Sequence, residues 1–294
     1  MKLSPHIAQQ LANAGLDATD VTDLIMHALA EDLDGGVDVT SEATVPADQR
    51  AALDLVARQA GTTAGVWVAA AVFDLHSDHD TVVEVLVTDG TDVVTGDVIL
   101  TATGRTRDLL VCERTALNLL GQLSGVASAT RAWTNALAGT GARVRDTRKT
   151  TPMLRKLEKY AVRCGGGVNH RMSLSDAALV KDNHIVAAGG VREAFAAVRS
   201  KFPQVPVEVE VDNLDQLREV LDAGADLVLL DNFTIEQLRE AVAINAGRAQ
   251  LEASGGLTLA DAHAVGSTGV DFLAVGALTH SARVMDIGAD LRSI

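Results

Sequence analysis

The sequence predicts an α/β protein in which a closed or nearly closed barrel of parallel strands follows a smaller α+β domain. From about Arg143 onward, short β-rich runs alternate with helical stretches, which is the order of βαβ units. The last three units repeat at roughly 22 residues, the length of one strand, one helix and two loops. No G-x-G-x-x-G motif follows the first strand, so a barrel is favoured over an open doubly wound sheet.

The first part of the chain, residues 1 to 115, mixes helical and strand patterns and predicts the α+β domain. The expected elements are a helical stretch ending near Asp32, a strand over Arg50–Arg58, a helix over Val66–His76, and a strand over Thr81–Val87 that continues into a hairpin through Asp89-Gly90. The barrel domain is expected to span residues 116 to 280.

A long amphipathic helix is expected from about Val111 to Ala138, because leucine and alanine recur there at helical spacing. Gly121 and Gly125 form a G-x-x-x-G pair inside it. Since no apolar segment of about 20 residues surrounds this pair, it indicates close packing in a protein core more than a membrane dimer.

Six short runs are expected to form the barrel strands: Arg143–Thr147, Ala177–Lys181, Val207–Val211, Asp226–Leu230, Gln250–Ala253 and Asp271–Val275. Between them, Thr151 is expected to cap a helix that starts with Pro152, and Thr234 a helix that stops at Gly247.

Composition narrows the class of partner. The net charge of −14 opposes nucleic-acid phosphates and anionic membranes, and 3% aromatic residues leave few rings for base stacking. The start of the chain lacks the apolar core of a signal peptide, and no run of about 18 uncharged apolar residues occurs. Cys112 and Cys164 form no close pair in sequence, which suits a reducing compartment. From charge, aromatic content and the absence of a signal-peptide pattern together, we expect a cytoplasmic protein with neither nucleic-acid nor membrane partners.

The expected active site lies where the barrel strands end, because α/β-barrel enzymes bind substrates at the carboxyl ends of their strands. Polar residues or glycine follow all six expected strands. A single charged residue after a strand is usually only the first solvated position, but six polar strand ends in register predict one binding bowl.

Charge is sorted around this bowl. The first two strands and the segment between them concentrate basic residues suited to an anionic substrate: Arg148, Lys149, Arg163, His170, Arg171 and Lys181. The neighbouring Arg155, Lys156 and Lys159 fit a solvated helix face instead. Glu210 and Asp231 end the third and fourth strands, and they predict either Mg²⁺ ligands or ion-pair partners of Lys181.

Small residues end the last two strands. Ser254-Gly255-Gly256 and Gly276-Ala277 leave backbone N–H groups open to a phosphate, and eight-stranded barrels bind phosphate at their last two loops. Each glycine taken singly is explained equally well by a turn.

Long stretches of the chain resemble the quinolinate phosphoribosyltransferase family. The resemblance rests on DTRKTTPMLRKLEKYAVRCGGGVNHR at 146–171, CERTALNLLGQLSGVAS at 112–128, VEVEVDNLDQL at 207–217 and EASGGL at 252–257. It implies an incomplete barrel of six strands and an N-terminal α/β-sandwich domain rejoined by residues 281–294. It also implies transfer of the phosphoribosyl group of 5-phosphoribosyl 1-pyrophosphate to the ring nitrogen of quinolinate. Pyrophosphate and CO₂ are lost, and nicotinate mononucleotide forms for NAD synthesis.

The resemblance implies roles for single residues. Lys149, Lys181, Glu210 and Asp231 are the expected catalytic residues, and the last two are also expected to hold Mg²⁺, directly or indirectly. The expected ligands of the quinolinate carboxylates are Arg148, His170 and Arg171, with Arg114 from the neighbouring subunit of a homodimer or higher oligomer. The other expected substrate-binding residues are Thr147, Ser254, Gly255, Gly256, Val275, Gly276 and Ala277. The chain departs from the family pattern at GVDVT, 36–40, and at Ala274, where serine is common.

Three alternatives stay open. The first is a related enzyme that uses nicotinate without decarboxylation, or another small molecule; the grouping of Arg114 with Arg148, His170 and Arg171 favours a dicarboxylate instead. The second is a lyase that forms a Schiff base on Lys181, against which the two facing carboxylates argue. The third is a binding protein that keeps the fold without the reaction.

Overall fold

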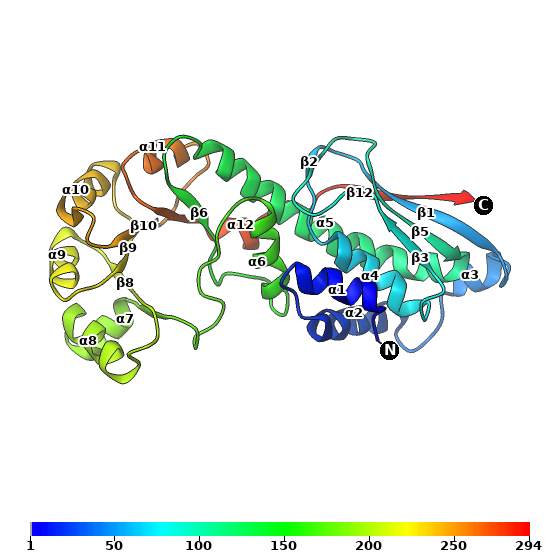
Figure 1. The fold of residues 1–294 in the computed structure, drawn as a ribbon, viewed down its shortest axis with the longest axis horizontal. Coiled ribbons are helices and arrows are strands. Elements are labelled where there is room, and N and C mark those ends of the chain that lie inside the picture. Colours follow the sequence, from blue (N-terminus) through cyan, green and yellow to red (C-terminus); the bar gives the residue numbers. More distant parts are fainter. Residues whose placement is uncertain (1) are drawn as a thin grey trace. The chain divides into compact units, whose positions relative to one another are not determined.

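The structure is a computed structural model that describes residues 2–294 as two compact units, and each is treated by itself (Figure 1). Unit 1 contains the chain up to residue 129 together with residues 151–166 and 281–294. Unit 2 contains residues 130–150 and 167–280. Residues 116–129 and 151–166, which the sequence analysis assigned to the barrel domain, therefore group with unit 1.

Unit 1 is built on an antiparallel sheet of four strands in the order β12-β1-β5-β3. The last strand of the chain pairs with the first, so that Leu291 lies opposite Leu53. A small second sheet pairs β2 with β4. The strands are β1 (Arg50–Ala57), β2 (Gly61–Thr62), β3 (Val82–Val85), β4 (Asp92–Val93), β5 (Val98–Arg105) and β12 (Ile287–Ser293).

The predicted hairpin through Asp89-Gly90 is wrong in its pairing. β3 pairs with β5, whereas β4, which follows the turn, pairs with β2. The turn is held by long-range bonds instead, since the Gly90 N–H donates to the Thr63 carbonyl and the Asp89 carboxylate accepts the Val66 N–H.

The helices of unit 1 include one that is buried on nearly every side and one that is very long. α4 (Val66–His76) has the predicted bounds, and its residues from Val68 to Leu75 are all buried. The predicted long helix is confirmed as α5 (Thr106–Ala136), which continues into unit 2. The others are α1 (Pro5–Asn13), α2 (Ala18–Leu33), α3 (Val39–Thr44) and α6 (Arg155–Cys164).

The G-x-x-x-G pair of α5 lies against the C-terminal segment of the chain. A Cβ atom added at Gly125 would come within 2.2 Å of the Arg283 carbonyl oxygen, and one at Gly121 within 3.0 Å of that of Met285. The Met285 N–H also donates to the Gly121 carbonyl. The pair therefore serves close packing inside unit 1, as the sequence analysis inferred.

Two expectations about α6 are wrong. The helix begins at Arg155 and not at Pro152, because Met153 has a φ of 69°, outside the helical range. Lys159 does not lie on a solvated face, since residues 157–162 are all buried and its exposed fraction is 0%. The sequence shows a basic helix face, but only packing decides whether that face meets solvent.

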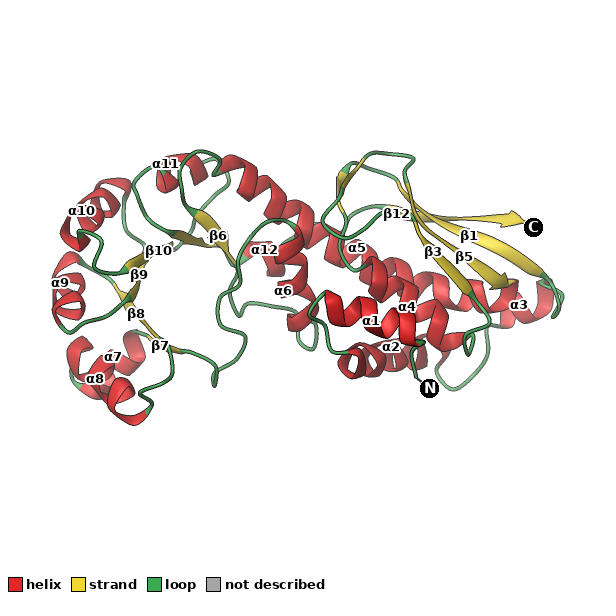
Figure 2. Cartoon of the chain, viewed as in Figure 1, coloured by secondary structure: helices red, strands yellow, loops and turns green. Residues whose placement is uncertain are grey.

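Unit 2 is an incomplete parallel barrel, which confirms the predicted fold class. Its six strands have the order β6-β11-β10-β9-β8-β7, and β6 and β7 at the two ends do not pair with each other. The sheet curves strongly, with the helices between its strands on the outer face (Figure 2). The strands are β6 (Arg143–Arg145), β7 (Ala178–Val180), β8 (Val207–Val211), β9 (Leu227–Asp231), β10 (Gln250–Ser254) and β11 (Phe272–Ala274).

Each predicted barrel strand is present within two residues of its expected bounds. Thr234 caps its helix as predicted, in a reciprocal pair of bonds with Gln237. The helices are α7 (Asp182–Ala188), α8 (Val191–Lys201), α9 (Leu214–Asp222), α10 (Ile235–Asn245), α11 (Ala262–Gly266) and α12 (Ala277–His280).

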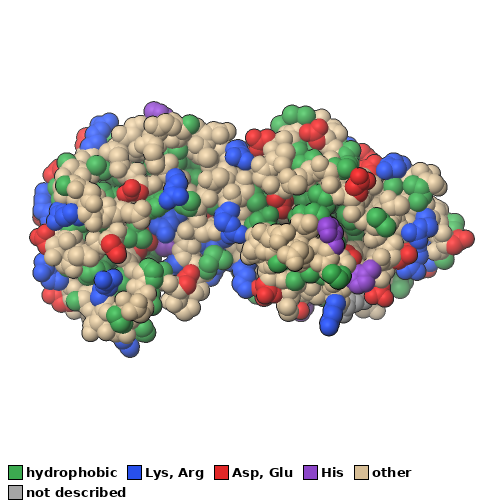
Figure 3. Space-filling model, in the orientation of Figure 1, with side chains coloured by type: hydrophobic (Ala, Val, Ile, Leu, Met, Phe, Trp, Pro, Cys, Tyr) green, Lys and Arg blue, Asp and Glu red, His purple; other side chains and the backbone are tan. Residues whose placement is uncertain are grey.

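The described part of the chain contains no helix with both the length and the apolar character to cross a membrane. On the face drawn in Figure 3, lysine and arginine side chains are interspersed with aspartate and glutamate. This surface differs from the continuous basic stripe that is typical of nucleic-acid binding.

Candidate active site

A cavity of about 440 Å³ lies in unit 2 and is lined by the residues that end the barrel strands. It brings together nine of the predicted site residues: Thr147, Arg148, Lys149, His170, Arg171, Lys181, Glu210, Asp231 and Ser254. Four further residues line it: Leu179, Leu229, Glu252 and Ala274. The strand ends therefore converge on one bowl, as predicted.

Parallel pairing explains why residues so far apart in sequence meet here. All six strands run in one direction, so their carboxyl ends share one edge of the sheet. Lys149 follows β6 and Lys181 follows β7, while Glu210 is the fourth residue of β8. Asp231 ends β9 directly opposite Ser254, which ends β10.

His170 and Arg171 reach the cavity from the segment between α6 and β7. Val168 forms a parallel bridge with Arg145, which attaches this segment to the free edge of β6. The buried Asp146 carboxylate then accepts the His170 N–H at 2.8 Å and the Asn169 side-chain amide at 2.5 Å. Asp146 thus holds the loop that carries both basic residues.

Two arginines form the cationic side of the cavity. Burial lowers the pKa of the Arg171 guanidinium, and the nearby positive charge of Arg148 lowers it further. The Nε atom of Arg148 is buried and has no hydrogen-bond partner among the described residues. Two adjacent cations and an unused donor favour an anion in this part of the cavity.

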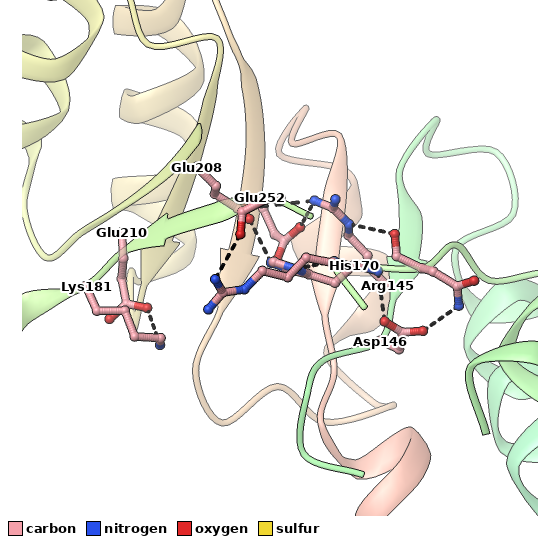
Figure 4. Close-up of polar contacts among 10 residues, drawn as sticks. Arg145, Asp146, His170, Lys181, Glu208, Glu210 and Glu252 are labelled. Atoms are coloured by element: carbon pink, nitrogen blue, oxygen red, sulfur yellow. Dashed lines mark hydrogen bonds and ion pairs between the residues drawn. The ribbon is translucent and has the colours of Figure 1, made fainter. Parts of the chain in front are cut away.

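Lys181 and Glu210 form an ion pair, with 2.8 Å between Nζ and Oε2. The sequence left Mg²⁺ binding and ion pairing with Lys181 as alternatives for this carboxylate, and the structure contains the ion pair. Figure 4 shows this pair beside a second group of charged residues. Glu210 is 12% exposed and Lys181 47% exposed, so the lysine remains open to a ligand.

The other predicted residues lie outside the cavity lining. Gly255, Gly256, Val275, Gly276 and Ala277 continue from the ends of β10 and β11. Gly255 is required by its surroundings, since its φ is 99° and a Cβ atom there would lie 2.1 Å from Asn232 Oδ1. A Cβ atom at Gly276 would lie 3.0 Å from Lys149 Cδ, an atom of a flexible side chain. Arg114 is an exposed residue of α5 in unit 1. Arg163, whose guanidinium donates to the Ala14 carbonyl, also belongs to unit 1.

A buried charged cluster lies beneath the cavity, and the sequence analysis missed it as a unit (Figure 4). Arg145 Nη1 lies 2.6 Å from Glu252 Oε2 and 3.9 Å from Glu208 Oε1. His170 Nε2 lies 2.7 Å from Glu208 Oε2 and 3.8 Å from Glu252 Oε1. The exposed fractions of Glu208 and Glu252 are 3% and 0%.

The electrostatics of this cluster are unusual because two carboxyls share a buried site with one arginine. Burial raises the pKa of the Glu252 carboxyl to about 7, and the neighbouring Glu208 carboxylate acts in the same direction. The positive charge of Arg145 opposes this shift. At neutral pH Glu252 therefore exists in both protonation states.

His170, Glu208 and Glu252 also place three ligand atoms within 4.8 Å of one another, a spacing that a metal ion could bridge. Glu208 Oε1 and Oε2 and Glu252 Oε1 accept no hydrogen bond among the described residues, but the cation of Arg145 already lies at this site. The guanidinium of Arg145 supplies the compensating charge to Glu252, and the His170 Nδ1 accepts the Arg171 N–H at 2.7 Å. The group is better described as a polar network than as a metal centre.

A sequence signal for the cluster existed. In a β-strand, alternate residues share a face, so Glu208 shares the face of Glu210, and Glu252 that of Ser254. Each glutamate precedes a strand-end ligand by two positions on the same face of its strand. Their sequence positions therefore predict charged groups beneath the bowl.

Comparison with known proteins identifies the family of this chain. The description "Quinolinate phosphoribosyl transferase, C-terminal domain" matches residues 126–290, and the corresponding N-terminal domain matches residues 38–124. The chain belongs to the quinolinate phosphoribosyltransferase family. Its membership covers both units, so the predicted resemblance is confirmed.

Several named members of this family are close to the chain. The "Nicotinate-nucleotide pyrophosphorylase [carboxylating]" of Mycobacterium leprae is 50% identical over 273 residues, which cover 92% of this chain and 96% of that protein. A "Probable nicotinate-nucleotide pyrophosphorylase [carboxylating]" of Bacillus subtilis is 39% identical, covering 91% and 92%. The crystal structure of NadC from Streptococcus pyogenes matches with a TM-score of 0.91 and 40% identity, covering 95% of this chain and 99% of that one.

Proposed function

We infer that this quinolinate phosphoribosyltransferase family member transfers the phosphoribosyl group of 5-phosphoribosyl 1-pyrophosphate to the ring nitrogen of quinolinate. Pyrophosphate and CO₂ leave, and nicotinate mononucleotide is formed for NAD synthesis. The observation that carries this inference is the 50% identity, over 92% of the chain, to an enzyme named for that reaction. The sorted charges of the cavity supply the physical basis.

The diacid is the ligand that suits the cationic side. Arg148 and Arg171 each present a guanidinium, which can bind a carboxylate through two parallel hydrogen bonds. Quinolinate carries two carboxylates on adjacent ring atoms, so two arginines on one wall match it. The phosphate and pyrophosphate of the second substrate are assigned to Lys149, Lys181 and the loops 254–256 and 275–277.

The carboxylates of Glu210 and Asp231 are placed to act on the ribosyl group. As the bond from C1 to pyrophosphate breaks, positive charge develops on C1, and two carboxylates on the facing wall can offset it. Lys149 and Lys181 neutralise the leaving pyrophosphate. Once the ring nitrogen is bonded to C1 it is cationic, so the adjacent carboxylate can leave as CO₂. The carbanion that remains beside this charge then takes up a proton.

The donor set also fits Mg²⁺. Glu210 and Asp231 present hard oxygen ligands in the same cavity, and a site that supplies one or two carboxylates and leaves the rest to substrate phosphates is typical of this ion. Bound there, Mg²⁺ would supply charge neutralisation for pyrophosphate. The Lys181 ion pair with Glu210 would then exchange partners in the loaded site.

The alternatives make different predictions. A Schiff-base lysine must have its amine free to attack a carbonyl, whereas the amine of Lys181 is paired with Glu210 at 2.8 Å. A lyase would be trapped on Lys181 by borohydride with a carbonyl substrate, and we expect no trapping. Transfer to nicotinate would release no CO₂. Activity with nicotinate and none with quinolinate would replace the proposed reaction.

The decisive experiment supplies quinolinate, 5-phosphoribosyl 1-pyrophosphate and Mg²⁺, and follows nicotinate mononucleotide and CO₂ in equal amounts. Lys149→Ala and Glu210→Ala should each lower kcat at least about 100-fold, because charge stabilisation in the transition state is lost. Lys156→Ala, the same change at an exposed residue paired with Asp20, is the matched control and should keep full activity. Normal turnover in either active-site variant would remove that residue from the mechanism.

We also propose that the enzyme is a cytoplasmic homodimer, or a higher oligomer, in which Arg114 completes the site of a neighbouring subunit. The support is that Arg114 is exposed on α5 and does not line the cavity of unit 2. A reducing compartment suits Cys112 and Cys164, neither of which forms a disulfide.

A further inference from the structure

The charges of the buried cluster can be counted from its hydrogen bonds. The Nδ1 atom of His170 accepts the backbone N–H of Arg171 at 2.7 Å, so it carries no proton. The ring is therefore neutral, and its Nε2 atom lies 2.7 Å from Glu208 Oε2. Arg145 contributes one positive charge and Glu208 one negative charge. The net charge of the cluster then depends on the proton of Glu252 alone.

We propose that Glu252 is a positioning residue that must be protonated for tight binding of the dianionic substrate, so that its proton is thermodynamically linked to occupation of the cavity. This inference rests on the proposed function, because it identifies the ligand as a pyridine dicarboxylate. Glu252 is not among the residues that the family resemblance implies as substrate ligands.

Glu252 lies where its charge can act on the ligand. The residue lines the cavity together with Arg148 and Arg171, although its own exposed fraction is 0%. With the proton in place, the floor of the cavity is neutral and the two arginines act on the ligand undiminished. Without it, an uncompensated carboxylate repels the carboxylates of the ligand through a medium of low dielectric constant.

The groups that face Glu252 from every packed element are consistent with this assignment. β6 contributes Arg145 at 2.6 Å, and β8 contributes Glu208. The loop before β7 contributes His170 at 3.8 Å, which is itself held by the buried Asp146. The residues paired with Glu252 on β9 and β11, Leu229 and Phe272, carry no charge. The other charged residues of the cavity are Arg148, Lys149, Arg171, Lys181, Glu210 and Asp231.

Proton binding by Glu252 and ligand binding are thermodynamically linked, and this linkage determines how the affinity for the ligand changes with pH. Because the protonated form binds more tightly, binding of the ligand must be accompanied by proton uptake on Glu252 at any pH where free Glu252 is ionised and bound Glu252 is not. One repulsive charge at this range weakens binding by about tenfold. If the protonated form binds the ligand ten times more tightly than the ionised form, binding is accompanied by uptake of about half a proton near pH 7.5 and of almost none at pH 5.5.

The test is calorimetric titration of the full-length protein with pyridine-2,3-dicarboxylate at pH 5.5 and pH 7.5. Each titration is repeated in two buffers of different ionisation enthalpy, which gives the number of protons taken up. We expect about half a proton at pH 7.5 in the wild type. We expect none in Glu252→Gln, whose affinity should not vary between the two pH values.

Two further variants keep the test decisive. Glu236→Gln makes the same charge change at an exposed position of α10 and should behave as the wild type. Glu252→Met, apolar and of similar volume, replaces Glu252→Gln if that variant does not fold, and should also show no uptake.

The outcomes separate the two proposals. No proton uptake by the wild type at pH 7.5, or equal uptake in the wild type and a folded Glu252 variant, overturns the role of Glu252. Turnover of quinolinate by the same wild-type sample would leave the proposed function intact in that case. Failure to bind the dicarboxylate at either pH, with no turnover, overturns the proposed function and this inference together.

Discussion

At the residue scale, the charge of Glu252 is set by its surroundings. Its carboxyl lies in the interior of unit 2 between an arginine and a second carboxylate, and burial raises its pKa to about 7. In the unfolded chain the same group returns to its ordinary value of 4.5. The folded state therefore binds this proton more tightly than the unfolded state does.

This difference predicts how stability varies with pH. Below pH 4.5 the carboxyl is protonated in both states, and its contribution is fully present. As pH rises toward 7, only the unfolded state loses the proton, so the wild type should lose roughly 1–2 kcal/mol of unfolding free energy relative to Glu252→Gln. Urea unfolding of both proteins at pH 5.5 and 8 measures the change. A difference that is constant with pH would contradict the assignment.

At the element scale, α5 illustrates how a sequence motif and its packing combine. Alanine in place of a helical glycine normally stabilises a helix by roughly 0.5–1 kcal/mol. At Gly125 the new methyl group would lie 2.2 Å from the Arg283 carbonyl oxygen, a backbone atom that cannot rotate away. The steric cost must therefore exceed the gain in helix propensity.

We expect Gly125→Ala to lower the free energy of unfolding by about 1–3 kcal/mol, the usual cost of overpacking. The measurement is urea denaturation followed by circular dichroism. Gly36→Ala, in a bend outside the helices, is the control for the substitution itself, since a Cβ atom there would meet its nearest neighbour at an ordinary 3.4 Å. If Gly125→Ala is as stable as this control, the close contact between α5 and residues 283–285 is wrong.

At the scale of the whole molecule, we propose that the site is shared between two chains. Arg148 lines the cavity of unit 2, whereas Arg114 is exposed on α5 and belongs to unit 1. If Arg114 acts on the cavity of a neighbouring subunit, the two residues of one working site come from different chains. Such shared sites can be tested by complementation.

Arg114→Ala and Arg148→Ala should each be nearly inactive alone. When the two variants are co-expressed, about half of the dimers are mixed, and each mixed dimer contains one intact site. We therefore expect recovery of about a quarter of wild-type activity in the co-expressed sample. Activity that stays at the level of the single variants would show that both arginines act within one chain.

Much of this molecule follows from local sequence patterns. The six barrel strands and the helix over Val66–His76 were found from periodicity, because alternation and helical spacing are local properties. Seven of the nine predicted residues that line the cavity come at or just after the end of a strand, and parallel pairing places those ends at one edge. His170 and Arg171 come instead from the segment between α6 and β7. The family resemblance supplied the reaction, which no periodicity encodes.

Tertiary structure alone decided the remainder. The pairing of β3 with β5, the burial of Lys159 and the contact of Gly125 with residue 283 all join segments far apart in the chain. The proton of Glu252 depends on Arg145 and Glu208, which lie 107 and 44 positions away in sequence and meet it only in the barrel interior. Sequence patterns report which face of an element is apolar, but the charge of a buried group is set by the neighbours that folding brings to it.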